Sequence, residues 1–412
     1  DEGECFERFL DEAGLRLFRR PLDDTAPDGE TVSERELFLN LANGLKGDGA
    51  SAVQSATRLL QAMLQSPQFL YLIVQEPLNG TRALDEFELA SRLSYFLWAG
   101  PPDRELLEAA RAGELSESAQ LREQVERMWQ DRTRIERSWG TYLQEWSGVN
   151  SATVSDARRE KMIAALRAFY LDHLDSSRSL FELLSTPSVR LSGEMAEDYG
   201  FAPQQDEVDV YALDDEAMPV GLLAQPGIIA GMSAGGNARI TDRGLFIVSR
   251  MLCSELPELP ATLSDAVDSF SGEVPEDASP REISELRMTD PACGNCHGTF
   301  DPMAYPLEVF DGAGRIQSEP GPVDGAIPAL YTRLDAVPVG DAGEFSRELA
   351  GLELAQDCLV RNHLTFALGA LFDHREAHVS YLADEARASG GSALALAQAI
   401  ATSPLFREIS AP

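Results

Sequence analysis

Lysine is nearly absent from this sequence: Lys46 and Lys161 are the only two in 412 residues. Acidic side chains outnumber basic ones by 68 to 34, which leaves a formal net charge of −34. Nucleic acids and anionic membrane surfaces attract proteins mainly through basic side chains that displace counterions. The composition therefore argues against both as partners and favours a cationic partner, bound metal ions or a saline environment, with simple solubility as the plainest explanation.

Long apolar runs and cysteines are also scarce. No stretch is long and apolar enough for a membrane-spanning helix. The chain does not open on a signal-peptide pattern, so an exported protein would have lost its leader before residue 1. Five cysteines are too few for a disulfide scaffold in a chain that can hold two to four modules. The sequence also lacks a P-loop, a dinucleotide-binding motif and a Ser-His-Asp arrangement.

Apolar residues recur at three- and four-residue spacing over much of the chain, which is the pattern of amphipathic helices. The segments predicted to be helical are Ser33–Lys46, Ser51–Ile73, Asp85–Trp98, Asp103–Arg111, Ser116–Trp129, Arg134–Trp146, Asp156–His173, Ser179–Ser185, Glu344–Gly369, Glu376–Ala388 and Ala393–Ile409. Two further segments, Gly221–Met232 and Gly244–Cys253, are either buried helices or apolar strands, and Val208–Leu213 is compatible with a strand. The predicted fold class is mainly α, with several packed helical modules.

The stretch DPACGNCHGTFDP lies between two regions rich in proline, Leu256–Pro280 and Gly312–Asp341. Its CxxCH core consists of Cys293, Cys296 and His297, which one turn of helix would bring together. In c-type haem attachment, the two thiols form thioethers with the porphyrin and the histidine ligates the iron.

Zinc and a redox dithiol are the alternatives for this motif. Structural zinc takes four nitrogen or sulfur ligands, typically from two such pairs, and no second CxxC occurs in the chain. A thioredoxin-like dithiol needs a strand-to-helix setting, which the surrounding loops do not supply. Coincidence is a further alternative, because the motif fixes only three residues. On its own the motif favours haem.

The residues that follow the motif carry a family resemblance. In DPMAYPLEVFDGAGRIQ, the pattern D-P, L-E-x-F-D and G-R occupies Asp301, Pro302, Leu307, Glu308, Phe310, Asp311, Gly314 and Arg315. Together with CxxCH, this pattern resembles the planctomycete-type cytochromes, a bacterial family with many regions of unknown function. Further motifs extend the resemblance over nearly the whole chain: FRRPL (Phe18–Leu22), LLQAMLQSPQFLY, LASRLSYFLWAGPPDRELL (Leu89–Leu107), EDYG (Glu197–Gly200), Arg243-Gly244, FALG (Phe366–Gly369) and SPLFR (Ser403–Arg407).

The resemblance implies an exported, periplasmic or extracellular protein with one covalent haem c in a loop-rich segment packed by helical modules. The expected modules are 1–82 (N-terminal helical), 83–215 (helical, with the LSYFLW motif), 216–335 (haem c) and 336–412 (C-terminal helical). The implied function is electron transfer with a redox partner protein or within a larger redox complex. A haem oxidase or peroxidase outside the cytoplasm, and a structural subunit in which the haem supports folding, are the alternatives.

Three positions depart from the family pattern. Relatives carry His-Arg shortly before the first haem cysteine, where this chain has Arg287-Met288. The Ser-Pro element before Arg243-Gly244 is replaced by ARITD, and the usual glycine after D-P-x is Ala304. If the upstream histidine of the relatives touches the haem, that contact is changed in this protein.

His297 is the expected proximal iron ligand. The distal candidates are His363, brought in by tertiary packing, Met288 from the preceding helix and, less favoured, Met303, which lies only six residues past His297. His363 fits a half-buried helix histidine equally well, and His173 is expected at the surface. An open or water-bound site would permit peroxide or oxygen chemistry, whereas a second strong ligand favours electron transfer.

Arginines and further histidines complete the candidates. Arg315 is expected to bind a haem propionate, because a guanidinium pairs well with a carboxylate; Arg243 or Arg287 would serve equally. His374 and His378 lie four residues apart, as in a metal pair, although a solvent-facing position is the more ordinary explanation.

Carboxylates beside the haem motif have two interpretations. Glu308, Asp311 and Asp301 would bind a calcium ion, or they would order the surrounding loops by accepting hydrogen bonds from backbone N–H groups. The second is favoured, because acidic residues next to Gly and Pro commonly order loops in this way.

Three cysteines lie outside the motif. In bacteria that carry the family this sequence resembles, haem attachment by CxxCH takes place outside the cytoplasmic membrane. That compartment permits disulfides. We predict a disulfide between Cys253 and Cys358, with Cys5 free or paired elsewhere. The alternative is three buried thiols that act as small apolar groups.

Overall fold

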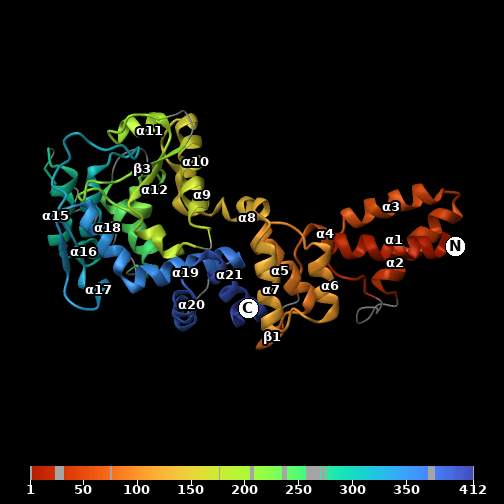
Figure 1. The fold of residues 1–412 in the computed structure, drawn as a ribbon. Helices are drawn as coiled ribbons and strands as arrows, with labels where there is room; N and C mark the ends of the chain where they lie inside the picture. The colour runs from red at the N-terminus through yellow and green to blue at the C-terminus, as the bar shows by residue number, and fades with distance from the viewer. Residues whose placement is uncertain are drawn as a thin grey trace. The chain divides into compact units, whose positions relative to one another are not determined.

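The computed structural model describes residues 2–23, 32–74, 77–175, 177–204, 208–233, 239–256, 270, 274–275, 277–369 and 376–411. Within them the protein is mainly α-helical with a few short strands (Figure 1), which confirms the predicted fold class. The chain forms two compact units: unit 1 combines Asp1–Ser138 with Ile400–Pro412, and unit 2 spans Trp139–Ala399. In the described part of the chain, no helix has both the length and the apolar character needed to cross a membrane.

Unit 1 is built from short helices and one strand pair. Its elements are α1 (Glu2–Leu17), α2 (Glu34–Gly47), α3 (Ala52–Leu64), α4 (Pro67–Leu70), β1 (Thr81–Ala83), α5 (Glu86–Trp98), α6 (Arg104–Ala112), α7 (Ser118–Trp129), α22 (Pro404–Arg407) and β6 (Glu408–Ser410). Helices α8 (Arg132–Trp139) and α21 (Ala393–Thr402) run across the two boundaries between the units.

Capping residues set where the helices of unit 1 begin. The hydroxyl of Ser51 accepts a hydrogen bond from the backbone of Gln54, whose side chain accepts one in return from the backbone of Ser51. The single helix predicted over Ser51–Ile73 is wrong, because α3 ends at Leu64 and α4 starts anew at Pro67. Proline suits the first turn of a helix, where its missing N–H is no loss.

Two arginines of unit 1 join motifs that lie far apart in the sequence. Arg19, in FRRPL, donates hydrogen bonds to the carbonyl oxygens of Gln68 and Tyr71, at 2.7 and 2.9 Å. Arg92, in the LSYFLW segment, donates to the carbonyl oxygen of Phe406 at 2.7 Å. Each arginine side chain therefore joins its own motif to the backbone of a second motif through hydrogen bonds.

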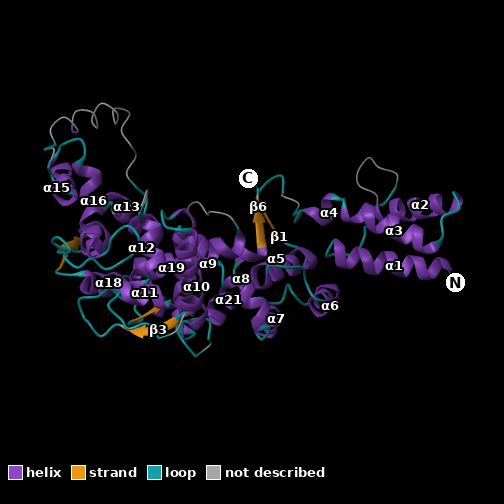
Figure 2. Ribbon diagram, turned by 90° about the horizontal axis from the view of Figure 1, so that it is seen from above, coloured by secondary structure: helices purple, strands orange, loops and turns teal. Residues whose placement is uncertain are grey.

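The last residues of unit 1 form a strand rather than a helix. β6 pairs antiparallel with β1, with Arg82 opposite Ile409 (Figure 2). The helix predicted to run to Ile409 is therefore wrong after Thr402, because Ser403 and Pro404 start the short α22 and the chain then extends.

Unit 2 holds the CxxCH segment. Its α-helices are α9 (Tyr142–Ser147), α10 (Asp156–Asp172), α11 (Gly193–Asp198), α12 (Pro226–Met232), α13 (Ile240–Phe246), α15 (Pro280–Thr289), α16 (Gly294–Ala304), α17 (Ala329–Thr332), α18 (Ala342–Gly351), α19 (Glu353–Leu368) and α20 (Glu376–Ala388). Its other elements are the 3-10 helices η1 (Val149–Ser151), η2 (Leu180–Leu184), η3 (Gly221–Ala224) and η6 (Tyr305–Val309), the π-helical turn η5 (Ile247–Met251), and the strands β2 (Ser188–Leu191), β3 (Asp209–Ala212), β4 (Gly325–Ile327) and β5 (Val337–Val339).

Several helices of unit 2 are shorter than predicted. Arg134–Trp146 divides into α8 and α9, and Glu344–Gly369 divides into α18 and α19. Gly221–Met232 and Gly244–Cys253, left open between helix and strand, are helical over most of their length. β2 pairs antiparallel with β3, and β4 with β5. The predicted connector Leu256–Pro280 lies largely outside the described residues.

The helix that carries the motif, α16, packs closely against α13 and α15 (Figure 2). Glycines make both contacts possible. A Cβ at Gly244 would lie 2.5 Å from the carbonyl oxygen of Phe300, and a Cβ at Gly294 would collide with the carbonyl oxygen of Met288. The glycine of Arg243-Gly244 is therefore required by the close approach of α13 to the haem-motif helix.

The arginine of the same pair is fully buried and binds the loop that follows α16. Nη1 of Arg243 donates to the carbonyl oxygen of Leu307 at 2.6 Å and to a carboxylate oxygen of Glu308 at 2.9 Å. Nη2 donates to the carbonyl oxygens of Phe310 and Asp311, at 2.9 and 3.0 Å. One guanidinium thus satisfies four acceptors of the L-E-x-F-D motif, and burial lowers its pKa.

A disulfide joins Cys253, after η5, to Cys358 in α19, which confirms the predicted pairing. It links two segments separated by 105 residues. The prediction for Cys5 concerns a side chain outside the described part of the structure.

Replacing Arg243 by lysine is expected to lower the free energy of unfolding by about 3 kcal/mol, because an ammonium cannot satisfy four separated acceptors and leaves buried groups unpaired. Urea unfolding followed by tryptophan fluorescence measures the change. Arg239→Lys is the matched control, since Arg239 is exposed and its one ion pair among the described residues is with Asp242, at 3.9 Å. Equal midpoints for the two variants would contradict the role assigned to Arg243.

Candidate functional site

The three residues of CxxCH share the first turn of α16. Cys293 is the N-cap residue, and its carbonyl oxygen accepts hydrogen bonds from the backbone N–H groups of Cys296 and His297, at 3.2 and 3.0 Å. A carboxylate oxygen of Asp290 accepts from the backbone N–H groups of Ala292 and Cys293, at 2.8 and 2.9 Å. Asp290 thereby fixes the tight turn that precedes the helix.

Both thiols of the motif are free and half-buried. Burial raises the pKa of the Cys293 thiol, and the neighbouring Asp290 raises it further. Reactive cysteines of redox dithiols have lowered pKa values, which expose a thiolate at neutral pH. The environment of Cys293 therefore disfavours the dithiol alternative.

The imidazole of His297 is held by a buried carboxylate one turn away on the same helix. Nδ1 lies 3.0 Å from Oδ2 of Asp301, and the Asp301 side chain is fully buried whereas that of His297 is 19% exposed. Because the carboxylate accepts the Nδ1 proton, Nε2 is left as the basic nitrogen. Metal-ligating histidines commonly have this arrangement, which fixes both the tautomer and the ring orientation.

Asp301 is itself fixed by a chain of hydrogen bonds. The hydroxyl of Ser284 donates to Oδ2 of Asp301 at 2.6 Å, and the hydroxyl of Tyr305 lies 2.8 Å from that of Ser284. The guanidinium of Arg281 stacks on the ring of Tyr305, 3.6 Å from its centre. Helices α15 and α16 together therefore hold the acceptor of the His297 proton.

Zinc is poorly supported by the surrounding ligands. In the described parts of the chain, no group of three or more histidine, cysteine or acidic residues could hold a metal ion. Cys253 and Cys358 are joined to each other, so neither offers a thiolate to complete a tetrahedral site with the motif. The donor set, two free thiols and one oriented imidazole on a single turn, fits a covalently attached haem.

Three family models match the chain, each described as a protein of unknown function. They are PSD5 (DUF1595) over residues 5–73, PSD4 (DUF1592) over residues 84–201 and PSCyt3 (DUF1588) over residues 220–320. Together they cover more than two thirds of the sequence, and the third contains CxxCH and L-E-x-F-D. The chain belongs to the planctomycete-type cytochrome family. Neither a curated protein nor a solved structure matches it.

In this planctomycete-type cytochrome, no described contact joins either methionine proposed as a distal ligand to the imidazole of His297. Met303 is fully buried in α16, about 240° around the helix from His297 and about 9 Å along it. Met288 packs against Ile240 and Ala304, and its sulfur lies 3.8 Å from the Tyr305 hydroxyl. Met288 therefore lies beside the hydrogen-bonded chain of Tyr305, Ser284 and Asp301 that holds Nδ1 of His297.

His363, the third distal candidate, is enclosed by aromatic rings. Its ring centre lies 4.3 Å from that of Tyr142, and Trp139 and Tyr170 pack around it. Nδ1 donates to the carbonyl oxygen of Leu359 at 2.7 Å, and Nε2 accepts from the Tyr170 hydroxyl at 2.8 Å. Both nitrogens are occupied, so the structure does not bring His363 together with the motif and assigns it to the core.

Of the remaining histidines, the structure describes His173 and His378, and no described contact joins either to the motif. His173, expected at the surface, is buried, and its two ring nitrogens contact the carbonyl oxygen of Phe169 and the hydroxyl of Thr186; that expectation is wrong, because the C-terminal end of α10 packs into the core. His378 is exposed on α20. His374 lies outside the described residues.

The arginines proposed for a propionate have different surroundings. Arg315 is 53% exposed and lies 3.8 Å from Asp311, and none of its described contacts is with the CxxCH turn. Arg243 is occupied by the loop after α16. Arg287 stacks near Phe270 at 5.6 Å and contacts the hydroxyl of Thr241 at 3.5 Å, close to the start of the motif.

The carboxylates considered for calcium have separate structural tasks. Glu308 pairs with Arg243, and Asp301 binds His297. A carboxylate oxygen of Asp311 accepts from the backbone N–H groups of Ala313 and Arg315, at 2.8 and 2.9 Å. This is loop ordering, the favoured interpretation of the sequence.

Sequence reasoning missed the role of Asp301. The signal was present, because an aspartate four residues after the motif histidine lies on the same face of a helix. The following Pro302 obscured it, since a residue before proline is biased away from helical conformation, yet α16 continues through Pro302. Ser284 and Tyr305 carried no comparable signal.

The core position of His363 predicts a pH dependence of stability. Burial lowers its pKa to about 4, below the ordinary value near 6.5, so the unfolded chain binds more protons between these values. Stability is therefore complete above about pH 6.5 and falls by roughly 3 kcal/mol as the pH falls through 4. His363→Gln, which retains a donor and an acceptor, is expected to remove this loss in urea unfolding.

His378→Gln is the matched control, because His378 is exposed and on a neighbouring helix. Its stability is expected to follow the native pH profile, to which the buried His173 also contributes. An unchanged acid slope in His363→Gln would refute the assignment.

Proposed function

We propose that this protein is an exported c-type cytochrome that carries one haem c, bound through thioethers to Cys293 and Cys296 with Nε2 of His297 as the proximal iron ligand. It transfers electrons to a redox partner protein or within a larger redox complex. The observation that carries the proposal is the single turn of α16, where two free thiols accompany an imidazole whose Nδ1 proton is held by Asp301. The bound haem supplies one-electron redox chemistry.

The protein contributes orientation and electrostatics to that chemistry. Asp301 holds the proton on Nδ1, which keeps Nε2 available and makes the imidazole more electron-rich. Ser284 and Tyr305 fix the carboxylate, so the ring cannot turn freely. The net charge of −34 favours a redox partner with a basic docking surface.

Export and module organisation belong to the same proposal. The disulfide between Cys253 and Cys358 is consistent with an oxidising compartment, the periplasm or the exterior. The three matched models lie inside the proposed modules 1–82, 83–215 and 216–335. One boundary between the compact units falls inside the second module, between Ser138 and Trp139. The modules proposed from the sequence therefore do not coincide with the compact units of the structure.

A ligand-binding haem enzyme, an oxidase or peroxidase, is the second candidate. The placement of the three distal candidates favours it. Met288 packs against Ile240, Ala304 and Tyr305, Met303 is fully buried, and Nε2 of His363 is hydrogen-bonded to Tyr170. A proximal histidine bound to a carboxylate is compatible with either function, since the distal side decides between them.

Expression in a periplasm with c-type haem maturation is expected to add the mass of one haem to the intact chain. Replacing Cys293 and Cys296 together by alanine removes that mass and the Soret band, because both thioethers are lost. Cys5→Ala is the control and retains the haem. A native chain that folds, as judged by circular dichroism, and carries no haem mass would refute every role that uses haem.

Carbon monoxide added to the same reduced protein separates the two functions. A low-spin spectrum that does not change supports electron transfer, because two strong ligands hold the iron. A spectrum that shifts supports the enzyme, because one coordination position accepts an external ligand.

Asp301→Asn is expected to raise the midpoint potential of the haem by on the order of 60 mV, the one-electron equivalent of a tenfold change, because a neutral amide makes the imidazole a weaker electron donor. Spectroelectrochemistry measures the potential. Asp324→Asn is the control, since it removes an exposed carboxylate that binds Arg281 and does not touch His297. Equal potentials in all three proteins would show that Asp301 has a packing role only.

A further inference from the structure

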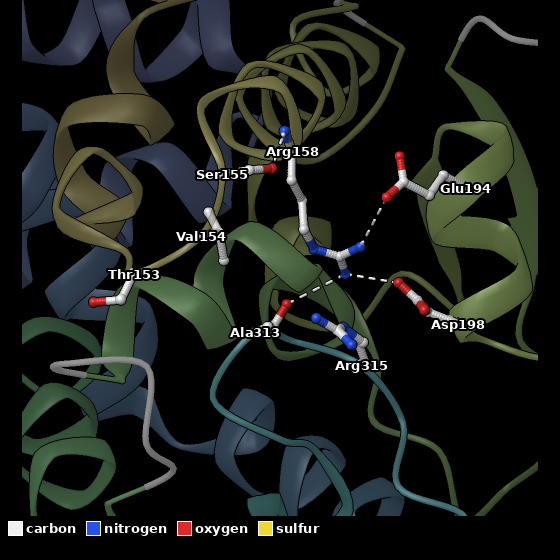
Figure 3. Close-up of a pocket in the computed structure, with 8 residues that line it drawn as sticks. All are labelled: Thr153, Val154, Ser155, Arg158, Glu194, Asp198, Ala313 and Arg315. Atoms are coloured by element: carbon white, nitrogen blue, oxygen red, sulfur yellow. Dashed lines mark hydrogen bonds and ion pairs between the residues drawn. The ribbon is translucent and has the colours of Figure 1, made fainter.

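A second candidate site lies in unit 2, and none of the CxxCH residues lines it. A pocket of about 500 Å³ is lined by residues 153–155 before α10, Arg158 of α10, Glu194 and Asp198 of α11, and Ala313 and Arg315 after the L-E-x-F-D motif (Figure 3). This volume is in the range of sites for small organic molecules. The lining combines the regions matched by PSD4 and PSCyt3, and it includes the aspartate of EDYG and the arginine of G-R.

Arg158 forms a fixed wall of the pocket. Its side chain is only 7% exposed, and Nη2 lies 2.7 Å from a carboxylate oxygen of Asp198 and 3.3 Å from the carbonyl oxygen of Ala313 (Figure 3). Its Nε is buried and meets no acceptor among the described residues. The guanidinium thus joins α10 to α11 and to the loop, and it retains one unsatisfied donor.

Arg315 is the available cation of the pocket. Half of its side chain is exposed, and the one ion pair of its guanidinium within the described residues is with Asp311, at 3.8 Å. This distance is beyond hydrogen-bond range. Five N–H donors in a planar fork are therefore available, and a carboxylate is the group that this fork binds in two-point fashion.

The opposite side of the pocket supplies acceptors. Glu194 accepts a hydrogen bond from Lys161 at 2.8 Å, which is the main cause of its lowered pKa, and the charges of Arg158 and Arg315 contribute. Together with Asp198, this carboxylate offers oxygen atoms to hydroxyl groups of a ligand. Two carboxylates in the lining repel an ion with several negative charges, so a monoanion suits the pocket better than a phosphate.

We propose that this pocket binds a small hydroxylated monocarboxylate, with its carboxylate on Arg315 and its hydroxyl groups on Glu194 and Asp198. The proposal does not involve the CxxCH residues. It replaces the haem propionate expected on Arg315 by the carboxylate of a separate ligand, and it gives the EDYG and G-R motifs a shared task in ligand recognition.

Isothermal titration of the full chain with D-glucuronate and D-gluconate tests the proposal. Saturable binding of one molecule per chain is expected for at least one of them. Glucose, which has hydroxyl groups and no carboxylate, and acetate, which has a carboxylate and no hydroxyl groups, are each expected to bind at least about tenfold more weakly, because each loses one set of charge-assisted hydrogen bonds.

Arg315→Gln is expected to weaken binding at least about tenfold, and Arg315→Lys is expected to recover part of the loss by retaining the charge. Arg239→Gln is the matched control and leaves binding unchanged, since Arg239 is 63% exposed with one carboxylate at 3.9 Å, as Arg315 is at 3.8 Å. Both glutamine variants retain their folds, because neither guanidinium makes a close ion pair.

Three results would overturn the proposal. The first is no saturable heat with either hydroxylated acid. The second is equal affinity for inorganic phosphate, which would indicate a general anion site. The third is native affinity in Arg315→Gln, which would place the ligand elsewhere on the chain.

Discussion

The buried guanidinium of Arg243 is the interaction on which the organisation of unit 2 depends. A fully buried cation is costly unless its donors find acceptors. Here Nη1 and Nη2 bind four acceptors from one short loop, while the buried Nε meets none among the described residues. The loop is fixed as a consequence, and so are both of its ends: η6, which continues from α16, and the turn that carries Arg315. The adjacent Gly244 brings α13 against α16, so one dipeptide sets the position of the motif helix from two directions.

Similar contacts recur in unit 1 and explain why the family motifs are spaced as they are. Arg19 binds the backbone beside SPQFLY, and Arg92 binds the backbone of SPLFR. In each case a long, planar donor reaches carbonyl oxygens that no helix or strand satisfies. Motifs that lie far apart in the sequence are therefore in direct contact: FRRPL with SPQFLY, and the LSYFLW segment with SPLFR. The strong excess of arginine over lysine in this chain agrees with such hydrogen bonds to backbone carbonyl oxygens.

The sequence predicts the fold class, most helix positions and the disulfide, because apolar periodicity and cysteine chemistry are local or few in number. It does not predict the breaks at Ser66-Pro67 or at Leu352, since apolar spacing continues across both. The burial of His173 and the enclosure of His363 depend on which helices meet, and no pattern within one helix reveals that. The CxxCH turn can be predicted from three residues of the sequence. The hydrogen bonds from Ser284 and Tyr305 that support Asp301 cannot, because they form only when α15 and α16 lie side by side. The roles of the motif residues themselves stay predictions.

The pairing of β1 with β6 has a consequence for how the chain reaches its final form. Thr81 and Ser410 are neighbours in space but are separated by 329 positions. All of unit 2 lies between them in the sequence, so the strand pair of unit 1 cannot close until unit 2 has been synthesised. Contacts of such long range form slowly, since the intervening chain must be brought to order first. Unit 2, whose residues are continuous, has no such dependence. We therefore expect unit 2 to be able to fold before β1 and β6 meet, and this strand pair to be among the last contacts that unit 1 forms.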